Sequence, residues 1–461
     1  MSVPLFLSHP KRMQAEFSGL KKIVLATALC CGLPLAQAQE QTPYALPNPL
    51  TLQDVMSASL QAHPLLATEQ ANLAKIQAQL GAQQAQDGLQ LDLVGRLAWR
   101  DYAKETEEFH LAALHARQSL YDFDRNRSQV EALQRHEEAQ TLLFENAENQ
   151  LKLQLMQGFF NVLLADFQYR IDNEAMAVAY VGLDKAKDEL DLKRLSDVDY
   201  LKLENEYQQI LVKRSRSEYQ QLQTRLALAN LMGLPDARPD ELTFPALKNY
   251  AQRSLNETTL EKLQQNVLQE NPELNALKKR LEAAQLKVQS QQAAAKPDIA
   301  LEGWAGQLSS YPEKREGNWN IGLTLNMPLY DSGLRDAKVS EAKADEQAVA
   351  AQIGLYEQKL RDKVADIYFQ IKLLEAERNQ NKIFGDYADL YLDYSRALYE
   401  NESKTDLGDA MVRLSEANYN QVAWQFKQAL LWASLDSLTG KALFENAEAS
   451  NSQAQQAELP Q

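Results

Sequence analysis

Two aspartates near the C-terminal end, Asp406 and Asp409, are the residues whose type and spacing best suit a chemical role. In a helix, residues three positions apart lie on one face, so the two carboxylates would project together. Such a pair either attracts cations or forms an ordinary solvated acidic face. The spacing by itself does not separate these two interpretations.

Catalytic and cofactor-binding patterns are absent from the sequence. Gly440-Lys441 lacks the upstream glycines of a phosphate-binding loop, and no serine lies in a nucleophile elbow. Of the five histidines, only His110 and His115 lie close together, and their odd spacing would place them on opposite faces of a strand. We therefore expect no enzyme activity, no metal site and no cofactor.

The N-terminus is typical of a secretory signal. Two lysines precede an apolar run over residues 23–31, and an Ala-Gln-Ala pattern ends at Ala38. The run is too short to span a membrane. We expect cleavage after Ala38, with Met1 or Met13 as the start; the alternative is a buried N-terminal helix. Both cysteines of the chain lie in this segment, so the secreted part would contain no thiol.

Composition narrows the class of protein further. The 461 residues include 48 Lys and Arg against 63 Asp and Glu, a formal net charge of −15. This excess of negative charge argues against a nucleic-acid partner, because the phosphate backbone is itself negative. Beyond the signal, no apolar run is long enough for a membrane-spanning helix, which excludes a helical membrane protein.

Two long tracts contain no proline, from Pro64 to Pro235 and from Pro328 to Pro460. Proline breaks helix interiors, so both tracts can form long helices. In the second tract, apolar residues recur at steps of four and three between Val349 and Leu374, which is typical of a helix-packing seam. A helix from about Arg125 to Leu192 would be about 100 Å long. The alternative is several shorter helices folded on each other.

The chain is also internally duplicated. His63-Pro64 matches Asn271-Pro272, Leu120-Tyr121-Asp122 matches Leu329-Tyr330-Asp331, and Ser196-Asp197-Val198 matches Thr405-Asp406-Leu407, at a nearly constant shift. Each half ends in a glycine, the residue that suits a left-handed helix cap. We therefore predict a signal peptide over residues 1–38, a first repeat over 39–233, a linker over 234–256, a second repeat over 257–440 and a disordered tail over 441–461.

Each repeat contains two predicted strands. In the second repeat, the alternation is carried by Trp319, Ile321, Leu323, Leu325 and Met327, with an upstream partner at about residues 298–306 and a loop that opens at Ser309. In the first repeat, residues 89–100 alternate, a weaker partner covers 109–120, and 101–108 form the loop between them.

Strands of about ten residues can cross a bilayer in a tilted barrel, but four strands cannot close one. An open sheet edge in lipid leaves backbone groups without hydrogen bonds. If the strands lie in a membrane, several chains must share one barrel, and the five apolar residues named above would face lipid. The alternative is two soluble hairpins packed on the helices.

The order helix, strand, strand, long helix, helix, repeated after a signal, resembles the TolC family of outer-membrane efflux proteins from about Leu52 to Gly440. The segment Pro328-Leu329-Tyr330-Asp331-Ser332-Gly333 is similar to the family's P-L-[FY]-D-x-G motif, where a strand turns into a long helix. The first repeat has Leu120-Tyr121-Asp122 without the proline and the glycine.

The resemblance implies a mainly α fold with a small β part. A long α-helical coiled-coil barrel would carry four membrane strands per chain, and a homotrimer would share one 12-stranded β-barrel. It also implies a passive exit duct in the outer membrane of a Gram-negative bacterium, with most of the chain in the periplasm. The partners would be outer-membrane lipid, a periplasmic adaptor (membrane fusion) protein and an inner-membrane transporter of a tripartite efflux or type I secretion system. The cargo stays open between drugs, metal ions and polypeptides.

The family's closed entrance lies at the turns between paired helices. Asp406 and Asp409 match its two constriction aspartates, while Tyr399 and Lys404 match its gating tyrosine and arginine loosely. The resemblance also implies an adaptor contact at the first-repeat turn, formed by Leu190, Leu192, Arg194, Leu195, Ser196 and Asp197. Asp191 stands there in place of the family's glycine.

Two other classes stay open at this point. A periplasmic coiled-coil scaffold without a pore would not need four strands placed symmetrically in two repeats. A periplasmic adaptor has one helical hairpin flanked by compact β domains, whereas this sequence predicts two hairpins and no such domains.

Overall fold

The computed structural model describes residues 46–97, 99–102, 105–108, 111–255, 258–310, 315–401, 406–441 and 443. The expected signal peptide lies outside these residues, as does nearly all of the expected tail. Leu443, from the segment expected to be a tail, is buried in the core.

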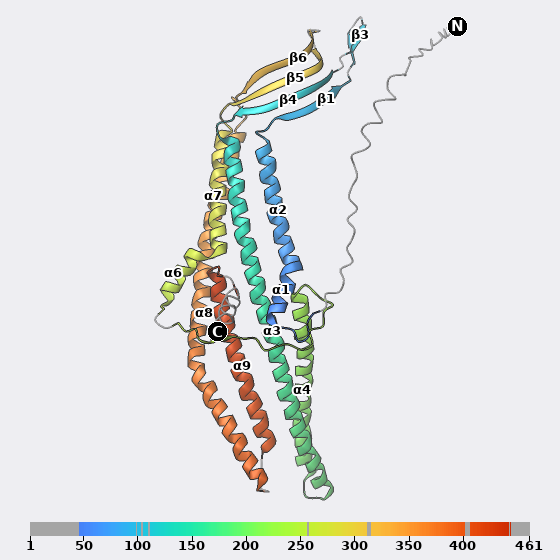
Figure 1. The fold of residues 1–461 in the computed structure, drawn as a ribbon, viewed down its shortest axis with the longest axis vertical. Coiled ribbons are helices and arrows are strands. Elements are labelled where there is room, and N and C mark those ends of the chain that lie inside the picture. Colours follow the sequence, from blue (N-terminus) through green and yellow to red (C-terminus); the bar gives the residue numbers. More distant parts are fainter. Residues whose placement is uncertain are drawn as a thin grey trace, which may run out of the picture. The chain divides into compact units, whose positions relative to one another are not determined.

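The helices occur in two matching sets (Figure 1). The first set is α1 (Leu52–Ala62), α2 (Pro64–Ala85), α3 (Arg125–Asp191) and α4 (Asp197–Leu231); the second is α6 (Leu260–Glu270), α7 (Pro272–Ala293), α8 (Leu334–Glu400) and α9 (Leu407–Leu438). Helices α3 and α8 each contain 67 residues, so each is about 100 Å long. The two proline-free tracts thus form the predicted long helices. Between the sets lies α5 (Lys248–Ala251).

The start of α2 and the start of α7 are built alike. The side chains of His63 and Asn271 cap these helices by accepting a hydrogen bond from a backbone N–H of the first turn, and a proline fills the first helical position. Gly233 and Gly440, with φ of 74° and 68°, lie against these two prolines. A Cβ atom at either glycine would be strained by the positive φ and would approach the proline ring to 3.3 Å or 3.1 Å.

Four antiparallel strands form a sheet in the order β1 (Gln90–Arg96), β4 (Leu111–Tyr121), β5 (Asp298–Ser310), β6 (Arg315–Asn326). The central pair, β4 and β5, joins the two repeats in one sheet. Strands β1 and β6 lie at the edges, and neither has a second partner in the described part of the chain. The sheet lies at one end of the helices (Figure 1).

The prediction of a loop over residues 101–108 is wrong. Strands β2 (Trp99–Tyr102) and β3 (Glu105–Glu108) pair there, with Trp99 opposite Glu108 and Tyr102 opposite Glu105. Glutamate has a low strand preference, so the composition suggests a loop, whereas backbone pairing between the two arms decides the conformation. The second hairpin is also longer than predicted, because β5 extends to Ser310 and β6 begins at Arg315.

The strand register separates an apolar face from a more polar one. Residues in paired positions across a sheet share a face, and two rows on one face read Leu93, Leu114, Ala305, Trp319 and Leu91, Ala116, Gly303, Ile321. A row on the other face reads Asp92, His115, Trp304, Asn320. The alternation seen in the sequence of β6 therefore continues across all four strands.

Two buried clusters hold the helices together. The first surrounds the stacked rings of Phe160 on α3 and Phe426 on α9, whose centroids are 4.1 Å apart. The second contains the predicted seam of α8, from Leu360 to Leu374, packed against α6, α7 and α9. Contacts between α3 and both α7 and α9 join the repeats. None of the described helices is long and apolar enough to cross a membrane.

Candidate functional site

The predicted pair of aspartates lies at the start of α9. Asp406 is the N-cap residue, although its side chain makes no capping hydrogen bond, and both aspartates are exposed. Asp409 forms an ion pair at 3.8 Å with Arg413, one turn further along the helix. Within α9, therefore, Asp409 has a long ion pair, and the carboxylate of Asp406 makes no capping hydrogen bond.

Tyr391 on α8 faces these aspartates. Its pKa is raised, first by desolvation and then by the negative charges of Asp409 and Asp406, because an anionic phenolate is disfavoured beside carboxylates. The phenol therefore stays neutral and can act as a hydrogen-bond donor. Its ring stacks on that of Tyr387, with centroids 5.8 Å apart.

The start of α9 is held against α3 by close contacts. At Gly408, a Cβ atom would come within 2.7 Å of the side chain of Val178. Further along, the hydroxyl of Ser415 donates a hydrogen bond of 2.7 Å to the carboxylate of Glu174. The two aspartates are thus carried by a helix whose position is set by a small residue and a polar contact.

The other two predicted constriction residues are Tyr399 and Lys404. Tyr399 is exposed next to the last residue of α8, and Lys404 lies outside the described residues. Tyr391 lies near the aspartates, and sequence reasoning missed it. It lies about two helical turns before Tyr399, in a tyrosine-rich stretch of α8 that could have pointed to it.

The first-repeat turn connects α3 to α4. Lys193 adopts a left-handed conformation with φ of 58°, and its N–H donates to the carbonyl of Leu190 at 2.8 Å. The side chain of Ser196 caps α4 by accepting from the N–H of Asp199 at 3.1 Å. The residue that needs the unusual conformation is therefore Lys193, two positions after Asp191.

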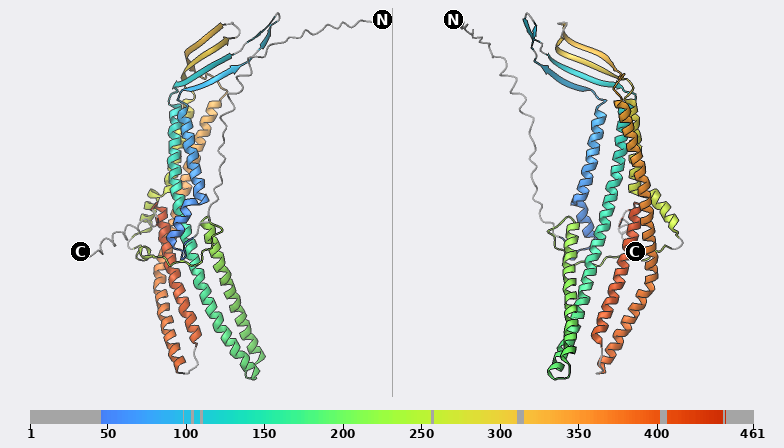
Figure 2. Two further views of the ribbon diagram at one scale, coloured as in Figure 1. Left: turned by 45° about the vertical axis from the view of Figure 1, so that its right-hand side comes forward. Right: turned by 180° about the vertical axis from the view of Figure 1, so that it is seen from behind.

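The six residues predicted to contact an adaptor gather at this tip, away from the sheet (Figure 2). Leu192, Arg194, Ser196 and Asp197 are exposed, and Leu190 and Leu195 are half-buried. The end of α8 and the start of α9 lie at the same end of the helices (Figures 1 and 2). The tip therefore presents one exposed leucine among polar side chains.

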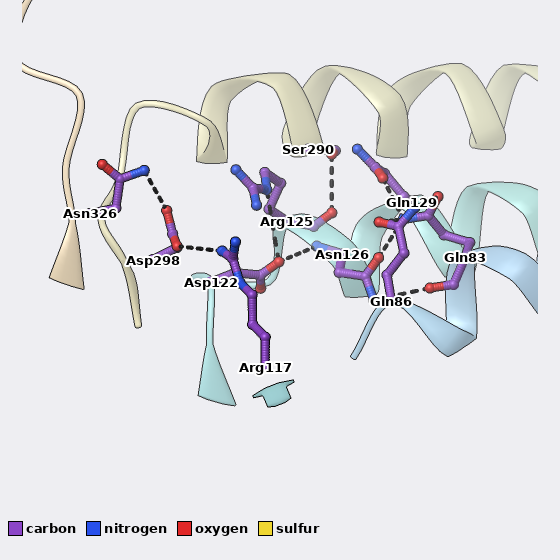
Figure 3. A network of polar contacts seen from close by, with 10 residues as sticks. All are labelled: Gln83, Gln86, Arg117, Asp122, Arg125, Asn126, Gln129, Ser290, Asp298 and Asn326. Atoms are coloured by element: carbon purple, nitrogen blue, oxygen red, sulfur yellow. Dashed lines mark hydrogen bonds and ion pairs between the residues drawn. The ribbon is translucent and has the colours of Figure 1, made fainter. Parts of the chain in front are cut away.

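A polar network joins the sheet to the helices (Figure 3). Asp122 accepts a 2.7 Å hydrogen bond from the backbone N–H of Asn126 at the start of α3. Ser290 of α7 donates to the carbonyl of Arg125 at 3.0 Å, and Arg117 of β4 forms an ion pair with Asp298 of β5 at 3.9 Å. These contacts fix the angle at which the strands leave the helices.

The turn before α8 repeats the same design. Asp331 accepts hydrogen bonds from the backbone N–H of Gly333 at 3.2 Å and from Nε of Arg335 at 2.6 Å. The guanidinium of Arg335 lowers the pKa of the Asp331 carboxyl. Gly333 has φ of 86°, and Asp124 occupies the matching left-handed position before α3 with φ of 65°. The first repeat keeps the turn without the glycine.

The five apolar residues of β6 and its end, from Trp319 to Met327, are all exposed in the single chain. Leu91 and Leu93 on the opposite edge strand are exposed as well. In the part of the chain that the structure describes, no group of three or more His, Cys, Asp or Glu side chains is arranged to hold a metal ion.

Comparisons with known proteins agree with this architecture. Residues 263–441 match the family model described as "Outer membrane efflux protein". The chain is 23% identical over 161 residues to the outer membrane efflux protein BepC of Brucella suis biovar 1 (strain 1330), a match that covers 34% of each protein. The matched part thus spans about a third of the length of that relative.

Solved outer-membrane channels have the same fold. The outer membrane protein VceC of Vibrio cholerae superimposes with a TM-score of 0.68 at 17% identity, over 85% of this chain and 96% of that one. The CmeC outer membrane channel of Campylobacter jejuni gives 0.69 at 13% identity, over 88% and 89%. Residues 263–441 are thus similar to the outer membrane efflux protein family, and the chain has the fold of the solved outer-membrane proteins VceC and CmeC.

Proposed function

We propose that three copies of this chain form one outer-membrane channel, the passive exit duct of a tripartite efflux or type I secretion system. The observation that carries the proposal is the four-stranded sheet, whose edge strands β1 and β6 have no second partner among the described residues. Leu93 on one edge and Ile321 on the other are 80% and 63% exposed. Paired edge to edge, three such sheets would close a barrel of twelve strands, in which no backbone group is left open to lipid.

The helices support the same assembly. Exposed apolar side chains lie along α4, among them Leu201 and Tyr219, and along α8, among them Phe369 and Leu390. Within the chain α4 contacts α3, and α8 contacts α7, α6 and α9, so α4 and α8 lie at different edges of the layer. Two different edges that pair head to tail build a ring if the rotation closes.

In this assembly the helical turns would meet at the periplasmic end. Three copies of Asp406 and Asp409 would form an acidic ring at a narrow axis, which favours cations over anions. The exposed turn around Leu192 would receive the adaptor, and the inner-membrane transporter would supply the energy. We likewise propose removal of residues 1–38 and a linker role for residues 234–256.

Cysteine cross-linking across the proposed strand contact tests the assembly. The two native cysteines lie in the segment expected to be removed, so introduced pairs would react alone. Leu93→Cys is combined in turn with cysteine at Trp319, Ile321 or Leu323, so that the three pairs cover neighbouring registers between chains. At least one pair should give a covalent trimer after oxidation, visible on a denaturing gel and lost on reduction.

The control is Leu93→Cys alone, which should give no cross-linked species on the denaturing gel. A ladder that continues beyond three chains would contradict a closed trimer. A folded, monodisperse monomer by light scattering in detergent would overturn the proposal.

A further inference from the structure

A cavity of about 640 Å³ lies among four helices, near the ends that lead to the sheet. Its lining includes Gln83 of α2, His136 of α3, Arg280 of α7 and Asp345 of α8. These helices pack in the order α2, α3, α7, α8. Residues from all four helices therefore line the cavity.

The cavity has an excess of positive charge. Lys287 forms an ion pair with Asp345 at 2.9 Å. Arg280 is half-buried, and within the described residues no carboxylate lies in ion-pair distance of it. Two cations therefore face one carboxylate, which leaves a net charge of one while His136 is neutral.

The neighbouring basic residues on the same two helices behave differently. Arg135 forms ion pairs with Glu138 at 2.8 Å and with Glu282 at 3.2 Å, and Lys279 pairs with Glu138 at 3.0 Å. Arg135 is next to His136 in the sequence, and Lys279 is next to Arg280, but neither side chain lines the cavity. The contact between α3 and α7 thus neutralises its own charges and leaves Arg280 available on the cavity side.

We propose that this cavity binds anions, namely solutes that carry sulfate, phosphate or carboxylate groups. The guanidinium of Arg280 offers N–H donors in the geometry that oxyanions accept, Lys287 adds a second donor, and Gln83, Gln129 and Gln291 add neutral ones. The proposal rests on the proposed function and deepens it: in the channel, the cavity would open to the lumen near the β-barrel. An anion-binding station at this end would complement the acidic residues at the other.

Binding should strengthen as the pH falls. Desolvation lowers the pKa of His136, and the charges of Arg280 and Lys287 lower it further. The groups that face it are these two cations from α7, Asp345 from α8 and the uncharged Gln83 from α2. His136 is therefore neutral at pH 7, and its protonation raises the net charge of the cavity from one to two. By reciprocity, a bound anion raises the pKa of His136.

Sulfate is a suitable probe because it stays doubly charged across the range in which histidine titrates. In the full-length protein in detergent, with histidine isotopically labelled, sulfate should raise the pKa of His136 measured by NMR. Arg280→Gln should weaken sulfate binding by about threefold to tenfold. The matched control, Arg135→Gln, removes the same charge from a residue that does not line the cavity and should leave binding unchanged.

Two further variants should change sulfate binding in different ways. Asp345→Asn removes the carboxylate of the cavity and should tighten sulfate binding, whereas His136→Gln should abolish the dependence of affinity on pH. Equal effects of the Arg280 and Arg135 variants, or no response of His136 to sulfate, would overturn the site.

The same site should be visible in channel currents. Sulfate added on the β-barrel side of a planar bilayer should reduce the potassium chloride current, more strongly at pH 5.5 than at pH 7.5, and less in Arg280→Gln. Absence of any current in the wild type would count against the channel function, while the NMR titration would still decide the anion site.

Discussion

Arginine at Ile321 should destabilise the assembled channel more than arginine at its neighbour Asn320. Ile321 lies near the middle of β6, which runs from Arg315 to Asn326, and stands opposite Gly303 of β5. Asn320 lies at nearly the same depth but on the other face, opposite Trp304. Because the two positions differ in face and hardly in depth, the pair isolates the cost of exposing a charge to lipid.

The expected cost follows from the position along the strand. Arginine on the lipid face costs about 2–4 kcal/mol at the midplane and about 0–1 kcal/mol near the interface. Two residues of a strand tilted by about 40° change the depth by about 5 Å, in an apolar band about 25 Å tall. We therefore expect about 2–4 kcal/mol per chain at Ile321, about 1–2 at Leu323 and less than about 1 at Leu325.

Refolding into phosphatidylcholine vesicles over a urea series measures this gradient, with the folded trimer scored on an unheated gel. Since every 1.4 kcal/mol is about tenfold in an equilibrium constant and each trimer carries three copies, the Ile321 variant should lose nearly all trimer where wild type still folds. Arginine at Asn320 should fold like wild type. A flat cost along β6, or equal loss at Asn320 and Ile321, would refute the assignment of the lipid face.

Three other outcomes are expected. Asp406→Asn combined with Asp409→Asn should lower cation selectivity and divalent block in planar bilayers, and Glu416→Gln on the same helix should do much less; unchanged selectivity would mean a merely solvated face. Phe426→Ala should destabilise the fold by about 3–5 kcal/mol, since this side chain is 1% exposed in the core that joins the repeats; a shift below about 1 kcal/mol in chemical denaturation would contradict that packing. Asp331 has a lowered pKa, so its contribution to stability is present above its unfolded pKa and is lost as the pH falls through the folded value. Asp331→Asn should therefore reduce the acid sensitivity of thermal unfolding, and an identical pH profile would argue against this role.

Much of the fold could be predicted because it depends on local patterns. A proline-free tract with apolar steps of four and three produces α8, since a helix satisfies its own backbone hydrogen bonds within a few residues. The alternation around Ile321 similarly predicts a strand with two different faces. The repeat of His63-Pro64 as Asn271-Pro272 predicts two helices that start alike, and both pairs do cap α2 and α7.

The candidate sites were less predictable because they depend on residues that are distant in sequence. Tyr391 lies near enough to Asp406 and Asp409 for their charges to raise its pKa, and nothing in the sequence around Tyr391 signals that proximity.

The sequence alone determines the two long helices, the four strands of the main sheet and the two matching halves, because proline placement and side-chain periodicity act over a few residues at a time. Only the tertiary structure decides that β4 pairs with β5 and that Phe160 stacks on Phe426. It also decides that His136 and Arg280 share one cavity. The physical reason is that such contacts follow from how whole helices pack and curve, and helix packing depends on the surfaces of both partners together.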